Sequence, residues 1–416
     1  MLTIGELIMK YMIFGLRNLQ RNYRRNLVTA MSIAFGFSAA SLFAGYTQIV
    51  YRGLAEQAIY GELLGHLTIS KKGLATEGQL HPERFLFNQE EIKKVSAVVQ
   101  ENFPDIYIAP RLHLNGILSN GRASTVFIAE GISPHDMQIL RGPHSGMSGA
   151  LEASKPTGVT VAAGLAEMLG LKEGSNAAVM LSTMHNQTNA LDVVIADSFS
   201  TGNAGTNDKF MYIPLKLAQT LYDADQQADR LTLLAQGRVP TDSDGLLLAA
   251  ALKDAGFEVA IDSWQELSAF YRQVKGMFDM IFGFLLAILL TIVLMSITNA
   301  MAMSVVERTK EIGTLRAIGM KRIGVIRLFV TEALLLVVAG CALGLVMTML
   351  VRLGVNAADI SYQPPNATDR VPLLIGRDAI KTAMVAALLG LFSIVAAWFP
   401  ARRAAQQPVI DSLAHM

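Results

Sequence analysis

The sequence predicts an α-helical membrane protein with four transmembrane helices and a large α+β domain inserted between the first and second. Two observations lead to this fold class. The 416 residues are 52% hydrophobic and only 17% charged, whereas soluble domains carry about 25% charged residues. The charges are also spaced unevenly and leave four long uncharged runs. Each run is close to the roughly 20 residues that a helix needs to cross the hydrocarbon core.

The uncharged runs set the predicted boundaries. They lie between Asn26 and Arg52, between Asp279 and Glu307, and over residues 333–351 and 382–401. We therefore predict transmembrane helices at residues 27–51, 276–306, 328–351 and 382–401. One such run could be a buried helix of a soluble core, but four in one chain favour membrane spans.

Lysine and arginine concentrate in the remaining short segments and predict the orientation. They are abundant in residues 1–26, in the loop 307–327 and in the tail 402–416, which places these segments and both termini in the cytoplasm. Segment 1–26 also has apolar residues at helical spacing, which predicts an amphipathic helix on the inner membrane surface. A plain extension of the first span is the alternative.

Residues 52–275 and the short loop 352–381 then lie outside the cytoplasm. The longer region mixes both kinds of element, which predicts an α+β domain. Strand patterns occur at residues 66–70, 106–110, 124–132 and 191–199, and helix patterns at 89–103, 164–170 and 244–257. The last of these helices begins with an aspartate at its cap position, Asp244.

The predicted spans are rich in small residues and almost free of charge, which disfavours an ion channel or a proton-coupled transporter. Ala34 and Ser38 lie on one face of the first span, and Gly340 and Gly344 form a GxxxG pattern in the third. Such residues predict close helix packing, both within the chain and with a second subunit. A lipophilic cargo would then be contacted by span aromatics, with simple exposure to membrane lipid as the alternative: Phe35, Phe43, Phe282 and Phe284.

No pattern in the sequence points to chemistry performed by this chain. The net charge of +1 gives no basic field for nucleic acid. Cys341 is the single cysteine, the seven histidines have no metal-ligand spacing, and GxxxxGK[ST] and GxSxG are both missing. We expect no catalytic residue, metal or cofactor in these 416 residues.

The loop after the second predicted span carries the most informative pattern. Ile312, Leu315 and Gly319 share one face of a short helix, and the charged Arg308, Glu311 and Arg316 project elsewhere. Such a helix can dock into a groove of a partner, although a basic turn that obeys the positive-inside rule would look similar.

This loop resembles the signature of the FtsX-like permease family, the transmembrane subunits of MacB-type (type VII) ABC transporters. The pattern E-R-x-x-E-I-G-x-L-R-A-I/L-G is matched along the loop, and residues 16–29, 158–181 and 398–413 also resemble the family. The resemblance implies that the matching loop residues couple the chain to an ATPase: Glu307, Arg308, Glu311, Ile312, Gly313, Leu315, Arg316 and Gly319.

The resemblance also implies a mechanism and partners. A dimer of cytoplasmic ABC ATPase subunits, which bind ATP and magnesium, would drive the periplasmic domains of two identical or paralogous permeases, an action called mechanotransmission. Because about 26 residues precede the first span, the layout is closest to Lol-type lipoprotein-releasing permeases of the bacterial inner membrane, whose ATPase is separate. We therefore expect release of lipoprotein or a similar lipophile, assisted by a periplasmic carrier. Export of a peptide, antibiotic or other amphiphile and FtsX-like signalling to a cell-wall hydrolase are the alternatives.

Overall fold

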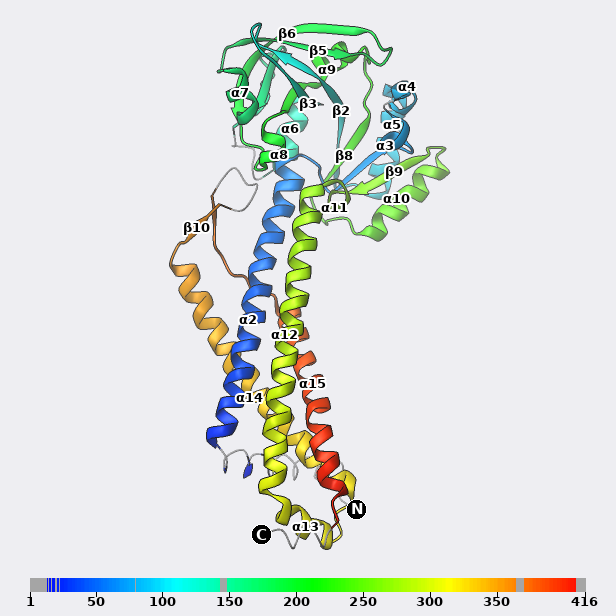
Figure 1. Ribbon diagram of the computed structural model, residues 1–416. Coiled ribbons are helices and arrows are strands. Elements are labelled where there is room, and N and C mark those ends of the chain that lie inside the picture. Colours follow the sequence, from blue (N-terminus) through cyan, green and yellow to red (C-terminus); the bar gives the residue numbers. More distant parts are fainter. Residues whose placement is uncertain are drawn as a thin grey trace. The chain divides into compact units, whose positions relative to one another are not determined.

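The chain folds into two compact units, which are considered separately. The computed structural model describes residues 13, 15, 17, 18, 21, 23–78, 80–142, 148–363 and 370–408. The helical unit comprises Met1–Val50, Lys275–Ile360 and Pro372–Met416, and the sheet unit comprises Tyr51–Val274 and Ser361–Val371 (Figure 1). The sheet unit is thus inserted between the first and second long helices, as the charge pattern predicts.

Four described helices of the chain are long and apolar enough to cross a membrane. They are α2 (Tyr23–Glu56), α12 (Ala269–Glu307), α14 (Arg322–Ala357) and α15 (Ala379–Gln406), and the short α13 (Thr309–Ala317) lies between α12 and α14. Each long helix extends past its predicted span, because charged residues end an apolar run without ending a helix. Most of the predicted surface helix at residues 1–26 lies outside the described residues, and α2 already begins at Tyr23.

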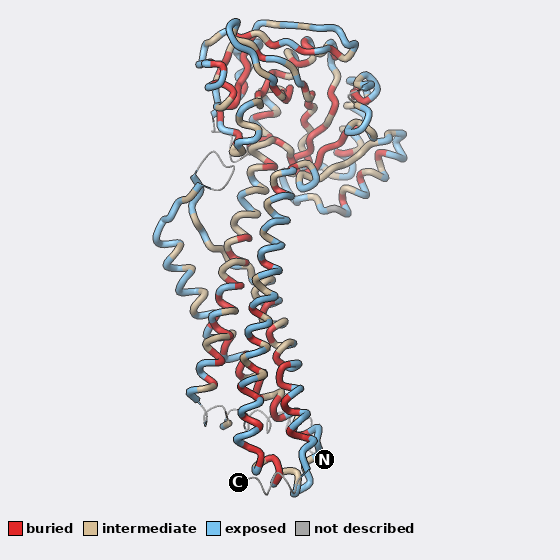
Figure 2. Tube along the Cα trace, in the orientation of Figure 1, coloured by how far each residue is buried: buried red, intermediate tan, exposed pale blue. Residues whose placement is uncertain are grey.

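The helical unit is apolar both inside and outside. Its core contains Phe37, Ile297, Phe329 and Leu389, all almost completely buried. Exposed stretches run along the long helices (Figure 2). Large apolar side chains are among the exposed residues: Met280, Phe284, Met295, Val346, Leu350 and Leu391. An apolar outer surface of this kind is typical of helices that face lipid.

The sheet unit contains nine strands whose pairing order is β3-β7-β4-β6-β5-β2-β8-β1-β9. β2 also pairs with β3, and this second pairing closes β3, β7, β4, β6, β5 and β2 into a ring. Alternate apolar residues such as Leu114, Phe127 and Val179 fill the core of the ring, and α7 and α9 add Leu165 and Leu221 to it. The strands are β1 (Leu67–Lys71), β2 (Ile106–Ser119), β3 (Ser124–Ile132), β4 (Gly158–Ala162), β5 (Asn176–Ser182), β6 (Thr188–Phe199), β7 (Phe210–Pro214), β8 (Arg230–Ala235) and β9 (Val259–Ser263).

The long strand β2 connects the ring to the rest of the sheet. Its first half, Ile106–Arg111, pairs with β8 in register Ile106 to Ala235, and its second half pairs with β3 and β5. The helices α5 and α10 share an apolar core with β1, β8 and β9. The helices of the sheet unit are α3 (Leu74–Glu77), α4 (Pro82–Phe85), α5 (Gln89–Asn102), α6 (Pro134–Arg141), α7 (Ala163–Leu169), α8 (Ala204–Asn207), α9 (Leu215–Tyr222), α10 (Asp242–Asp254), α11 (Trp264–Leu267) and the π-helix η1 (Gln57–Gly61), and the two-residue strands β10 (Ser361–Tyr362) and β11 (Val371–Pro372) pair separately.

Helix ends in the sheet unit follow side-chain capping. Asn88 and Glu91 form a reciprocal capping box at the start of α5. The start of α10 differs from the prediction, because Thr241 is the cap and Asp244 is the third residue that bonds back to it. The hydroxyl of Thr241 donates to the carboxylate of Asp244 at 2.7 Å. The helix therefore begins at Asp242, two residues earlier than predicted.

Candidate functional site

Two sharp backbone bends shape the loop between α12 and α14. At the first, Arg308 leaves the helical conformation, with φ −115° and ψ 18°, and α13 begins at Thr309. At the second, Gly319 has φ +107°. The amide of Gly319 donates to the carbonyl of Arg316 and the amide of Met320 to that of Leu315, at 3.1 and 3.0 Å. This Schellman ending needs a left-handed residue, which explains the glycine.

Arg308 joins the ends of three helices. Its side chain is buried and its Nη1 lies 3.2 Å from Oε2 of Glu332 in α14, which is also buried. Its Nε lies 2.9 Å from Oε2 of Glu311 in α13, and its guanidinium lies 5.8 Å from the ring centroid of Phe329. Because both carboxylates accept charge-assisted hydrogen bonds from one rigid guanidinium, α12, α13 and α14 are fixed to one another at this point.

Two further helices reach the same loop. Near the start of α2, Arg25 places its Nη1 2.7 Å from Oε1 of Glu307. Arg21, just before α2, pairs with Glu311. From the end of α15, the backbone carbonyl of Gln407 accepts a hydrogen bond from Arg316. Partial burial alone would raise the pKa of Glu311, but the guanidinium groups of Arg308 and Arg21 hold that pKa below its usual range. All the long helices of the unit are therefore connected to α13 or its flanks.

The predicted coupling residues separate into an inner and an outer set. Ile312 and Gly313 are buried against the helical unit, and Leu315 and Arg316 are half-buried. Gly319 is exposed, together with Ile318, of which 80% is exposed, and Ile323. Three basic side chains near these isoleucines are also exposed. We call the isoleucines and the basic residues together the tip: Lys310, Ile318, Lys321, Arg322 and Ile323.

Sequence reasoning missed several residues of this site. It did not select Ile318, because helical periodicity alone does not show that the chain turns at Gly319 and leaves Ile318 outside. It also did not pair Glu332 with Arg308, which lie 24 positions apart. The available signal was Glu332 itself, because it is a single acidic residue at the edge of an apolar run and follows a basic loop that could supply its partner.

The predicted packing residues lie together where α2 meets α14. A Cβ on Gly344 would lie 2.7 Å from the carbonyl oxygen of Ala34, and one on Gly340 would lie 2.7 Å from Cγ2 of Ile33. The hydroxyl of Thr348 donates to Ser38 at 3.1 Å. Both glycines therefore permit the two backbones to approach closely, as small residues do in packed membrane helices.

The four predicted cargo aromatics do not gather in one place. Phe43 of α2 and Phe282 of α12 stack with parallel rings at 6.2 Å between centroids, and Phe278 lies beside Phe43. Phe35 and Phe284 are exposed on the helix surfaces, at 58% and 70%. Phe282 is buried, so the Phe43–Phe282 pair belongs to the core of the helical unit and not to its exposed surface.

The described residues contain no group of three His, Cys, Asp or Glu side chains that could hold a metal ion. The site consists of ion pairs and an exposed tip. Comparison with known proteins identifies this part of the chain. The FtsX-like permease C-terminal family matches residues 283–409, which include α13, the tip and Glu332. Residues 283–409 are an FtsX-like permease domain. We call the residues joined at this loop the Arg308 cluster: Arg21, Arg25, Glu307, Arg308, Glu311, Arg316, Glu332 and Gln407. All of them except Arg21 and Arg25 lie within the FtsX-like domain.

Curated relatives of the chain are MacB-type proteins. It is 25% identical over 216 residues to the macrolide export ATP-binding/permease protein MacB of Chromobacterium violaceum, a match that covers 50% of this chain and 31% of that protein. It is 30% identical over 141 residues to the pyoverdine export ATP-binding/permease protein PvdT of Pseudomonas entomophila, covering 34% of this chain and 20% of that protein. An uncharacterised ABC transporter permease of Methanocaldococcus jannaschii is 28% identical over 151 residues, or 36% of each chain. The matched region spans about a third or less of the length of the two exporters.

Two solved structures are similar to part of this chain. The periplasmic region of MacB from Actinobacillus actinomycetemcomitans aligns with a TM-score of 0.34 at 12% identity, covering 50% of this chain and 92% of that one. The extracellular domain of the ABC-type transporter YknZ from Gram-positive bacteria aligns with a TM-score of 0.31 at 12% identity, covering 48% and 98%.

Proposed function

We propose that this chain is the permease subunit of a MacB-type ABC transporter of the bacterial inner membrane. The four long helices span the membrane, with the tip and both termini in the cytoplasm and the sheet unit in the periplasm. An ABC ATPase dimer outside these 416 residues binds ATP and magnesium, and a second permease subunit completes the complex. ATP-driven movement of the ATPase is transmitted through the helices to the sheet unit.

The Arg308 cluster is the observation that carries this proposal. A force applied to α13 would reach α12 through Arg308, α14 through Glu332 and α15 through the contact of Arg316 with Gln407. The set consists of one buried ion pair, Arg308–Glu332, and several partly exposed contacts that join the other helix ends to it. It fits a loop that receives movement from a partner and distributes it to several helices.

The tip supplies the surface on which that partner would act. Ile318 and Ile323 are large exposed apolar residues, and Lys310, Lys321 and Arg322 surround them with positive charge. The chemistry matches a groove with an apolar floor and an acidic rim on the ATPase. Ile312, Gly313 and Arg308 act from within, because they hold the tip against the helices.

For the cargo we propose a small amphiphile such as an antibiotic or siderophore, taken up on the periplasmic side. The named substrates of two relatives, macrolides and pyoverdine, support this choice. Release of lipoprotein with the help of a periplasmic carrier is the second candidate.

The ATPase contact is tested by co-purification from mild detergent. Ile318→Asp places a charge in the apolar centre of the tip, so recovery of ATPase should fall at least tenfold relative to the unmodified chain. Ile380→Asp changes another exposed isoleucine, at the start of α15, and should leave recovery unchanged. Equal recovery with Ile318→Asp would contradict docking at the tip.

The cargo is tested on the purified complex in lipid nanodiscs. We expect a macrolide to stimulate ATP hydrolysis several-fold, with no response to a triacylated lipoprotein. Stimulation by the lipoprotein alone would replace the first cargo with the second.

A further inference from the structure

The end of α2 is irregular and depends on the sheet for its hydrogen bonds. After Glu56 the helix widens into η1, and the amides of Leu64 and Gly65 donate to the carbonyls of Ala58 and Ile59, both at 3.1 Å. Leu63 is fully buried with φ +57°. The last carbonyls of a helix have no partner within the helix, and burial makes an unsatisfied carbonyl costly.

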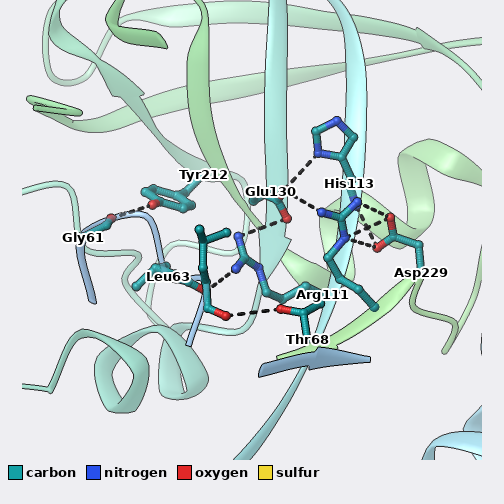
Figure 3. A network of polar contacts seen from close by, with 10 residues as sticks. Gly61, Leu63, Thr68, Arg111, His113, Glu130, Tyr212 and Asp229 are labelled. Carbon is teal, nitrogen blue, oxygen red and sulfur yellow. Dashed lines mark hydrogen bonds and ion pairs between the residues drawn. The ribbon is translucent and has the colours of Figure 1, made fainter. Parts of the chain in front are cut away.

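Three strands of the sheet unit provide the missing donors. The hydroxyl of Tyr212 in β7 donates to the carbonyl of Gly61 at 3.2 Å, and the hydroxyl of Thr68 in β1 donates to that of Leu64 at 3.2 Å. Between them, the Arg111 guanidinium of β2 donates to the carbonyl of Leu63 (Figure 3). The helix end is therefore capped from several strands rather than by its own sequence.

Arg111 is itself held on its far side. Its Nη2 lies 3.1 Å from Oε2 of Glu130 in β3, and both residues are buried. Glu130 is approached from its other side by Nδ1 of His113 at 2.9 Å and by Nη1 of Arg230 at 3.6 Å (Figure 3). Burial alone would raise the pKa of Glu130, but Arg111, Arg230 and the hydrogen bond from His113 hold that pKa well below its usual range. The carboxylate stays ionised, so the pair persists across the physiological pH range.

The segment that follows α2 packs on the sheet mainly through apolar side chains. Ile59 and Leu63 pack with Ala109, Leu234 and Tyr212 in one buried cluster. Apolar burial stabilises such a contact without fixing its direction. The Arg111 guanidinium adds a directional hydrogen bond to the carbonyl of Leu63, and its ion pair with Glu130 holds the guanidinium from the other side.

We propose that Arg111 is a positioning residue that locks the end of α2 to β2 and β3, so that displacement of α2 is delivered to the sheet. β2 is the strand shared by the ring and the rest of the sheet, and an input there reaches both. The transport consequence of this inference rests on the proposed function, whereas the lock itself does not.

The lock is tested by hydrogen exchange of the full chain in nanodiscs. In Arg111→Met the peptide covering residues 57–66 should exchange at least tenfold faster, and peptides of β6 should keep their rates. Arg141→Met is the matched control, because Arg141 is also a buried arginine that donates to carbonyls, those of Ser148 and Gly149. It should leave residues 57–66 protected. Equal loss of protection across the sheet unit in Arg111→Met would mean a general stabilising role and overturn the proposal.

A double variant separates the lock from folding. Arg111→Met combined with Glu130→Met leaves neither charge buried alone, and such replacements are often tolerated. We expect this variant to fold, to co-purify with the ATPase and to hydrolyse ATP at the unmodified rate, with cargo export per ATP reduced at least fivefold. Unchanged export per ATP would overturn the proposal. If the unmodified complex shows no ATP-driven export, the proposed function fails, and the exchange experiment still decides whether Arg111 locks the helix end.

Discussion

At the residue scale, two buried arginines organise the two units. Arg308 joins helix ends through Glu311 and Glu332, and Arg111 joins a helix end to the sheet through Glu130. A buried charge is tolerated only when it is paired, so removal of one partner leaves the other at a large cost. The sequence shows which residues are charged, but it does not show which of them are buried. The two buried ion pairs, Arg308–Glu332 and Arg111–Glu130, join residues 24 and 19 positions apart.

Arg308→Ala should therefore destabilise the helical unit by about 3–5 kcal/mol, because Glu332 would keep a buried charge without its guanidinium. Arg21→Ala breaks an ion pair whose arginine side chain is 69% exposed, and should cost less than about 1 kcal/mol. Melting temperatures in detergent compare the two variants. A similar small loss for both would show that the Arg308 pair does not stabilise the loop.

Glu62 gives the sheet unit a pH dependence of its own. Burial raises its pKa from 4.5 to about 7, so the folded chain keeps this proton over a range where the unfolded chain has lost it. The contribution of Glu62 to stability is present below pH 4.5 and is lost as the pH rises to about 7. Glu62→Gln removes this loss and should gain on the order of 3 kcal/mol over the unmodified chain above that range. Melting temperatures across pH 4–8 measure it, and a constant difference between the two proteins would contradict the assignment.

At the element scale, the packing of α14 on α2 depends on the absence of a side chain at Gly340 and Gly344. Gly344→Ala would place a Cβ 2.7 Å from the carbonyl oxygen of Ala34 and 2.9 Å from Cδ1 of Phe37, which should cost about 1–3 kcal/mol. Gly354→Ala on the same helix meets nothing within 4 Å and should be neutral or slightly stabilising. Thermal unfolding of both variants in detergent provides the comparison. Equal stability of the two would mean that α2 and α14 are not closely packed there.

Local patterns predict the elements well and their long-range pairing poorly. The strand at 124–132 and the helix at 89–103 agree with β3 and α5 almost to the residue, because alternation and capping are local properties. The parallel pairings of β3 with β7 and of β4 with β6, which complete the ring, join strands distant in sequence and have no such local signal. The outer position of Ile318 was also hidden, since it depends on the φ +107° of Gly319 and not on helical periodicity.

At the scale of the whole molecule, the charge pattern predicts one inserted unit at residues 52–275, and the contacts within the chain define a unit of Tyr51–Val274 together with Ser361–Val371. The loop motif that suggested an FtsX-like permease lies inside the region that the family comparison identifies. Cargo is the property that sequence reaches least, because it depends on surfaces formed with partners. The stacked Phe43–Phe282 pair illustrates this, since two of the four selected aromatics proved to be exposed elsewhere.

The most direct test of the account is the rate of ATP hydrolysis by the affinity-purified chain with its partners in nanodiscs. We predict that a P-loop ATPase co-purifies, that the complex hydrolyses ATP, and that Arg308→Ala lowers cargo stimulation of hydrolysis while the ATPase is still recovered. Purification of the intact, folded chain with no ATPase and no ATP hydrolysis would contradict the central claim that this chain is driven by an ABC ATPase through its α13 loop.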